Sequence, residues 1–334
     1  MAGGERQNIS KMANILADEI IDILGWTQCG PLDVNWRCDL PTVHSKKTKG
    51  THATDICWYY DEPYGPNIRT FVHTDLKSYA KGSITKNTLG SAIFTLSTAV
   101  HCAESSEQWQ TLYGVSNTIR HEVHGLLFIY NHDEGFDKDF RQMLLSVNET
   151  RTLSLPARRR IIVAGPEDIE ALAILCADLN VWAAKIQLPA NGPNFSFFYP
   201  ERANVKKFSR PSWRQALSIR SITAKIVPVV FREKLESSDY DVFLLYYRGS
   251  CNRVEEFTYL LDYLYMRQVP TNSESIEIVI LSADDVDIAI SNYHSCINRY
   301  REIYSPGSSL DKIKVRLAPR VTPHFSAIEI GFRD

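Results

Sequence analysis

The spacing of apolar and polar positions predicts that helices and strands alternate along the first half of the chain. Residues 9–24 place apolar side chains at positions 12, 15, 16, 20, 23 and 24, the spacing of an amphipathic helix, and Gly25 follows as a stop. The later stretches read as three strands, a helix, a nearly all-apolar buried strand and a last helix. In chain order they are Leu32–Cys38, Thr54–Tyr60, Ile68–Ser78, Leu89–Ala103, His124–Asn131 and Phe136–Leu145. This α-β-β-β-α-β order is typical of an α/β module with a mixed sheet.

The second half of the chain predicts another α/β unit with a partly parallel sheet. Its strand–helix pairs are 160–164 with 166–179, 242–247 with 253–265 and 276–282 with 284–304, and strands at 312–317 and 327–332 follow. The composition changes near Thr150–Arg160, where Pro156 and three arginines precede an apolar run. We therefore expect two domains, residues 1–150 and residues 151–334, the second serving recognition or partner binding.

The turn between the second and third predicted strands sets a register. Residues 62–68 contain two prolines and a glycine, and a hairpin centred on Gly65 places Asp61 opposite Arg69 and Asp55 opposite Asp75. Alternation along the strand puts Lys77 on the same face as Asp75. Two neighbouring carboxylates and a backbone carbonyl can bind a divalent cation, while a lysine beside them can orient a water. On the chemistry alone, an ordinary salt bridge at a strand end is the alternative.

This element order with Asp55 and Asp75-Leu76-Lys77 resembles the PD-(D/E)xK, or restriction-endonuclease-like, nuclease superfamily over roughly residues 9–145. The resemblance implies phosphodiester hydrolysis that depends on Mg²⁺ or Mn²⁺. It also implies that Asp55, Asp75 and the Leu76 carbonyl hold the metal, with Lys77 beside the attacking water. Many members add an acidic residue on the first helix, where Glu19 lies on the inward stripe and Asp22 is the next choice. Thr54 stands where the motif has proline.

Charge argues against binding to nucleic acid through bulk attraction, because 37 Lys/Arg and 39 Asp/Glu leave a net charge of −2. The halves differ: residues 1–150 hold 13 Lys/Arg against 18 Asp/Glu, so the remainder holds 24 against 21. Basic residues flank the predicted site, and the stretch 202–225 is free of acids and interleaved with aromatics. The predicted nucleic-acid contacts are Lys46, Lys47, Lys49, Lys81, Lys86, Lys206, Lys207, Arg210, Trp213 and Arg214. Solvated loops or a docking face for an acidic partner would explain the same residues.

The remaining features limit the location and the chemistry. Seven scattered cysteines with no CxxC pair predict reduced, mostly buried thiols and no zinc ribbon. With neither a secretory h-region nor an apolar run of membrane-spanning length, we expect a cytoplasmic protein without membrane contact. The resemblance implies a DNA endonuclease of an anti-phage defence system, acting with a companion protein subunit or as a homo-oligomer. The alternatives are a catalytically inactive nuclease-fold subunit that binds nucleic acid or protein, and a DNA repair or recombination nuclease.

Overall fold

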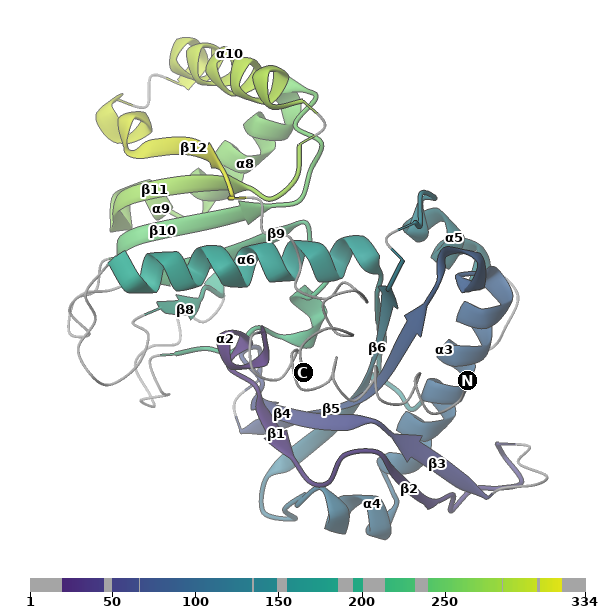
Figure 1. Ribbon diagram of the computed structural model, residues 1–334. Helices are drawn as coiled ribbons and strands as arrows, with labels where there is room; N and C mark the ends of the chain where they lie inside the picture. Colours follow the sequence, from purple (N-terminus) through teal and green to yellow (C-terminus); the bar gives the residue numbers. More distant parts are fainter. Residues whose placement is uncertain are drawn as a thin grey trace. The chain divides into compact units, whose positions relative to one another are not determined.

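The computed structural model describes residues 20–44, 50–65, 67–133, 135–148, 155–185, 195–200, 214–231, 240–283, 285–304 and 307–319 (Figure 1). They divide into two compact units. The first unit holds the described residues up to Glu170 together with Leu217–Thr223, and the second holds those of Ala171–Ala216 and Ala224–Val321. Among the described residues, no helix combines the length and the apolar character that crossing a bilayer requires.

A mixed five-stranded sheet in the order β1-β4-β5-β6-β7 forms the centre of the first unit. β1 (Thr27–Cys29), β4 (Ile56–Asp61) and β5 (Ile68–Tyr79) are antiparallel, whereas β6 (Arg120–Asn131) and β7 (Ile161–Ala164) continue the sheet in parallel with β5. The mixed α/β architecture expected from the sequence is thus confirmed. The β4–β5 hairpin pairs Asp61 with Arg69 and Ile56 with Thr74, the register expected from a turn centred on Gly65. Because β7 pairs with β6, this sheet continues past residue 150.

Helix α3 (Lys86–Ala103) covers the face of β5 and β6 (Figure 1). It begins at a capping box between Thr85 and Thr88, which satisfies backbone donors of its first turn. Its buried apolar residues recur at helical spacing and join the sheet in one core: Leu89, Ile93, Leu96 and Val100. The other helices of this unit are α2 (Asp22–Leu24), α4 (Glu107–Leu112) and α5 (Phe140–Asn148), with 3₁₀ turns at Lys81–Ser83 (η2) and Ile219–Ser221 (η3). Helix α6 (Pro166–Lys185) begins in the first unit, and its residues from Ala171 on belong to the second. Of the helix expected over residues 9–24, only its end from residue 20 is described.

A two-stranded antiparallel sheet leads into the central one. β2 (Val34–Arg37) pairs with β3 (Thr51–Thr54), with Trp36 opposite His52. The indole Nε1 of Trp36 donates a hydrogen bond to Oγ1 of Thr54 at 2.9 Å. Thr54 is followed by a bend at Asp55 and then by β4, so consecutive residues belong first to the small sheet and then to the central one.

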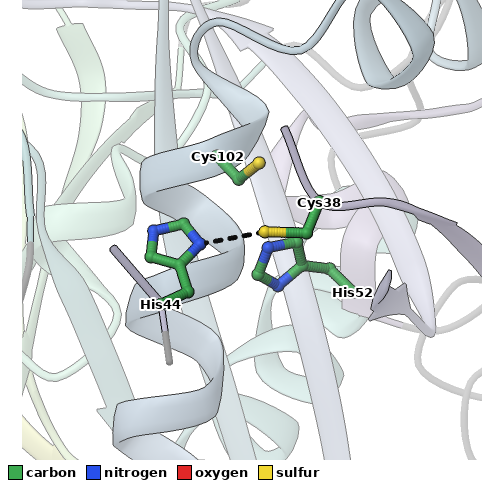
Figure 2. Close-up of side chains that lie close together, drawn as sticks. All are labelled: Cys38, His44, His52 and Cys102. Carbon is green, nitrogen blue, oxygen red and sulfur yellow. Dashed lines mark hydrogen bonds between the residues drawn. The ribbon is translucent and has the colours of Figure 1, made fainter. Parts of the chain in front are cut away.

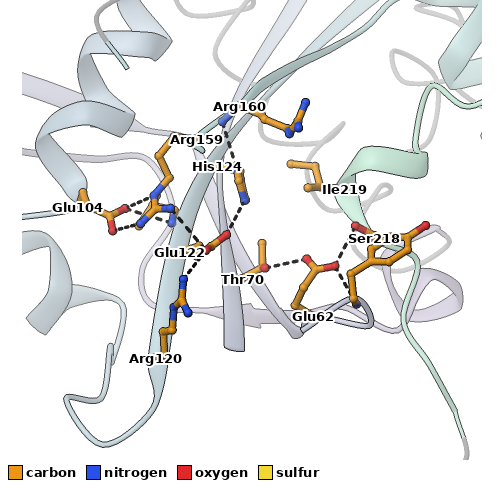
Figure 3. A network of polar contacts seen from close by, with 12 residues as sticks. Glu62, Thr70, Glu104, Arg120, Glu122, His124, Arg159, Arg160, Ser218 and Ile219 are labelled. Carbon is orange, nitrogen blue, oxygen red and sulfur yellow. Dashed lines mark hydrogen bonds and ion pairs between the residues drawn. The ribbon is translucent and has the colours of Figure 1, made fainter. Parts of the chain in front are cut away.

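A polar network joins the C-terminal end of α3 to β6 and to the segment before β7 (Figure 3). The guanidinium of Arg159 donates to both carboxylate oxygens of Glu104, through Nε at 2.7 Å and through Nη2, and lies 3.6 Å from Glu122. The Glu122 carboxylate also lies 3.5 Å from Arg120 and from His124. Three elements distant in sequence are therefore fixed by largely buried charge pairs.

The segment Leu217–Thr223 returns to the first unit through hydrogen bonds (Figure 3). The buried Glu62 carboxylate accepts hydrogen bonds from the hydroxyls of Tyr60 and Thr70, each at 3.1 Å, and from Ser218 at 3.3 Å. Part of the acid-free basic stretch 202–225 therefore packs with residues that lie more than 150 positions earlier in the chain.

The second unit contains a five-stranded sheet in the order β12-β11-β10-β9-β8. β10 (Tyr240–Tyr247), β11 (Ser273–Ile280) and β12 (Ile313–Leu317) are parallel, and β9 (Ile226–Phe231) and β8 (Phe195–Phe197) add antiparallel strands. The helical elements are α8 (Val254–Met266), α9 (Val269–Asn272), α10 (Val286–Tyr304) and the 3₁₀ turn η4 (Gly307–Lys312). The partly parallel sheet is confirmed, but β8 and β9 were not predicted from the sequence. The strand expected at 327–332 lies outside the described residues.

Candidate active site

β5 carries two of the predicted site residues on one face. Phe71 and His73 on this face are buried, and His73 stacks on Trp109 with ring centroids 6.2 Å apart. From Asp75 onward the same face opens, so that the side chains of Asp75 and Lys77 are 17% and 30% exposed. This face is therefore core at Phe71 and His73 and partly accessible at Asp75 and Lys77.

Asp55 is held in the bend between β3 and β4 by three hydrogen bonds. Its carboxylate Oδ2 accepts the backbone N–H of Leu76 at 2.7 Å. Its own N–H donates to the carbonyl of Thr74 at 3.3 Å, and its carbonyl accepts the N–H of Asp33 at 2.9 Å. These contacts aim the Asp55 side chain at β5, next to the carboxylate that follows Thr74.

The electrostatics of the three side chains reflect this proximity. Burial and the negative charge of Asp75 raise the pKa of Asp55 to about 6, although the Leu76 N–H and the charge of Lys77 act in the opposite direction. The ammonium of Lys77 donates a hydrogen bond to Oδ1 of Asp75. Burial lowers the pKa of Lys77, but the attraction of Asp75 outweighs burial and raises it overall, so the ammonium stays charged.

This donor set fits a hard divalent cation. The raised pKa of Asp55 beside the Asp75 charge marks a site short of positive charge, and carboxylate and carbonyl oxygens are the ligands of Mg²⁺. Within a strand the N–H and C=O of one residue face the same neighbour, so the Leu76 carbonyl lies on the side where its N–H meets Asp55. Asp55, Asp75 and Leu76 would hold the cation, leaving Lys77 beside it.

The other predicted residues are distributed unevenly. Glu19, Lys46, Lys47, Lys49, Lys206, Lys207, Arg210 and Trp213 lie outside the described residues. Asp22 is described and exposed in α2. Lys81 donates to Asp137 at 2.7 Å, and its backbone N–H donates to the Asp133 carboxylate. Lys86 is exposed in the first turn of α3, and the Arg214 guanidinium lies 5.1 Å from the ring centre of Phe195. The structure thus brings together Asp55, Asp75, Leu76 and Lys77, and it places Lys81 between acidic groups.

The sequence analysis missed a second cluster of chemically active side chains in the first unit. Cys38, His44, His52 and Cys102 lie together and are all buried (Figure 2). The first three follow one another within 15 residues, but the fourth is 50 positions further on in α3. No familiar ligand spacing joins them, so only the folded chain reveals the group.

Comparison with known proteins places the first half of the chain in a family. No curated protein matches the chain. Residues 1–168, half of the 334, match the family described as the GAPS4 protein PD-(D/E)XK nuclease domain. The match contains the whole α-β-β-β-α-β region and the acidic pair with its lysine. The resemblance inferred from Asp55, Asp75 and Lys77 is thereby confirmed, and the chain belongs to the GAPS4 PD-(D/E)XK nuclease domain family.

Proposed function

We propose that this protein is a metal-dependent nuclease that cleaves DNA as the nuclease component of an anti-phage defence system. The family supports a nuclease role in defence. The observation that carries the proposal is the juxtaposition of the Asp55 and Asp75 carboxylates with the Lys77 ammonium at the accessible end of β5.

Each group has a role that its contacts support. Asp55 and Asp75, with the Leu76 carbonyl, would hold Mg²⁺ or Mn²⁺, which when bound polarises a phosphodiester oxygen and lowers the pKa of water. Lys77 is charged and 30% exposed, so it can hold the attacking water and offset negative charge on the phosphate as the bond to the leaving oxygen breaks. Asp33 and Thr74 fix the backbone of Asp55 and act as positioning residues.

The substrate and partners follow from charge distribution and from the family. We propose DNA as the substrate, with the phosphates beside the cleaved bond contacting Lys81 and Lys86 and the basic residues of 46–49 and 206–214. We also propose a cytoplasmic location and a companion protein subunit of the defence system, for which the second unit would provide the recognition surface.

A cleavage assay tests the site. The full chain, alone and with a co-purified companion protein, is incubated with supercoiled, linear and single-stranded DNA and with RNA, in Mg²⁺, Mn²⁺ or EDTA. We expect DNA cleavage that EDTA abolishes and that Asp75→Asn or Lys77→Met lowers by about 10²-fold or more, since charge stabilisation and proton transfer are lost.

A matched control separates the site from general charge effects. Asp61→Asn removes a carboxylate at the opposite end of the same hairpin, where Asp61 pairs with Arg69 at 3.1 Å, and should cleave at the wild-type rate. Cleavage that persists in Asp75→Asn would refute the proposed site. Binding without cleavage by the wild-type chain in every condition would instead favour the inactive binding subunit.

A further inference from the structure

Four buried side chains converge between the small sheet and the end of α3 (Figure 2). Cys38 directly follows β2, His44 ends a turn, His52 lies in β3 and Cys102 is the second-last residue of α3. Each presents one possible ligand atom, and the four atoms lie within 4.8 Å of one another. The Sγ of Cys38 lies 3.2 Å from Nδ1 of His44.

The spacing agrees with a tetrahedral metal site. Zinc–sulfur bonds of about 2.3 Å and zinc–nitrogen bonds of about 2.0 Å place tetrahedral ligand atoms roughly 3.3–3.8 Å apart. A group already gathered within 4.8 Å therefore needs only small side-chain adjustments to surround an ion. Two thiolates also neutralise a divalent cation, which allows the complex to be buried without uncompensated charge.

The surrounding hydrogen bonds orient the ligands as metal sites require. Nε2 of His44 lies 3.2 Å from Nδ1 of His101, so a proton on Nε2 would leave Nδ1 of His44 to face Cys38 as a ligand. The backbone N–H of Asp39 donates to Sγ of Cys102 at 3.2 Å, a contact that stabilises a thiolate. The ring of His52 packs against Trp36 with centroids 4.8 Å apart, which limits its rotation.

We propose that Cys38, His44, His52 and Cys102 form a structural zinc site, separate from the carboxylate site of the proposed nuclease. Two cysteine sulfurs and two histidine nitrogens are the donors that zinc takes in closed structural sites, and all four are buried. The ion would join the loop between β2 and β3 to α3, two segments that already contact each other through Asp39 with Cys102 and through His44 with His101. The proposal stands whether or not the protein cleaves DNA.

Elemental analysis of the full chain, purified without a polyhistidine tag and without chelators, tests the site. We expect one zinc ion per chain in the wild type, and loss of most of it in Cys102→Ser and His44→Asn. Cys57→Ser is the matched control, because Cys57 is equally buried in the same unit but outside the cluster, and it should retain the zinc. Asp75→Asn should also retain it, which shows that the ion is not held by the acidic pair.

Cobalt substitution keeps the test decisive if a variant fails to fold. The wild-type chain loaded with Co²⁺ should show the intense visible bands of a tetrahedral ion and a thiolate-to-cobalt charge-transfer band. Zinc-free wild-type protein with no such cobalt spectrum would overturn the proposal. So would iron in place of zinc, full zinc content in Cys102→Ser, or a Cys38–Cys102 disulfide found by mass spectrometry.

Discussion

Replacing Arg159 by methionine should destabilise the first unit, because it removes a cation that contacts both Glu104 and Glu122 in the network of Figure 3. Breaking a buried ion pair from one side costs about 3–5 kcal/mol. In the variant, Glu122, which is 9% exposed, still has Arg120 and His124 at 3.5 Å. Glu104 is 23% exposed, so its carboxylate can turn to water. We therefore expect a loss of about 3 kcal/mol in the free energy of unfolding, at the low end of that range.

Urea unfolding followed by tryptophan fluorescence measures this loss, because Trp26, Trp36, Trp58 and Trp109 all lie in the first unit. With a slope of about 1–3 kcal/mol per molar urea, the midpoint should fall by roughly 1–3 M while the slope stays unchanged. The cycle of Arg159→Met with Glu104→Gln should show a coupling energy of about 1–3 kcal/mol.

Lys81→Met is the matched control, since it breaks an ion pair of the same unit in which Lys81 is 47% exposed and Asp137 is 67% exposed. Such a solvent-exposed pair contributes less than about 1 kcal/mol. If Arg159→Met cost no more than Lys81→Met, the inference that the buried network holds α3 to β6 would be refuted.

Two further predictions concern β6. Burial lowers the pKa of His124 to about 4, and its Nδ1 accepts the N–H of Arg160 at 3.1 Å, so the folded state holds the neutral ring. In the unfolded chain the His124 ring binds a proton below about pH 6.5, so folding stability should fall as pH drops from there, by about 2 kcal/mol from this residue at pH 5. The urea midpoints at pH 7.5 and pH 5 should therefore differ less in His124→Gln than in the wild type. An equal difference in both proteins would contradict a neutral, buried His124. Gly125→Ala would place a Cβ against Ile161 and 3.0 Å from Leu96 and from Val100, so we expect a loss of about 1–3 kcal/mol in the free energy of unfolding, read as a lower urea midpoint. An unchanged midpoint would show that these three side chains can move away.

The hairpin that brings the acidic pair together could be predicted from the sequence because its information is local. A turn centred on Gly65 and alternation along two strands are enough to place Asp55 near Asp75, and the observed pairing of Asp61 with Arg69 follows the same register. The burial of Phe71 and His73, on the face of β5 that also carries Asp75, could not be predicted. It depends on α3 and Trp109, which reach it only after the chain has folded.

Three features that the sequence analysis missed depend on contacts between distant segments. β7 joins the central sheet by pairing with β6, and Ser218 returns to Glu62 across 156 positions. The cluster of Cys38, His44, His52 and Cys102 likewise forms only when Cys102, near the end of α3, meets Cys38 beside β2. Neither hydrophobic periodicity nor motif spacing records such encounters, because each segment is locally consistent with several partners.

The continuity of β3 and β4 has a consequence for control of the acidic pair. Asp75 is fixed in a strand that pairs along its whole length with β6, whereas Asp55, although hydrogen-bonded to Thr74 and Leu76 of β5, directly follows the small sheet at Thr54. His52 stands three residues before Asp55, about 10 Å along an extended chain. A rotation of the small sheet against the central one would therefore change the gap between the two carboxylates without unfolding either sheet. A ligand or partner that reorients β2 and β3 would in this way change the affinity of the proposed site for a cation. This would be an allosteric effect, because the ligand would contact neither Asp55 nor Asp75.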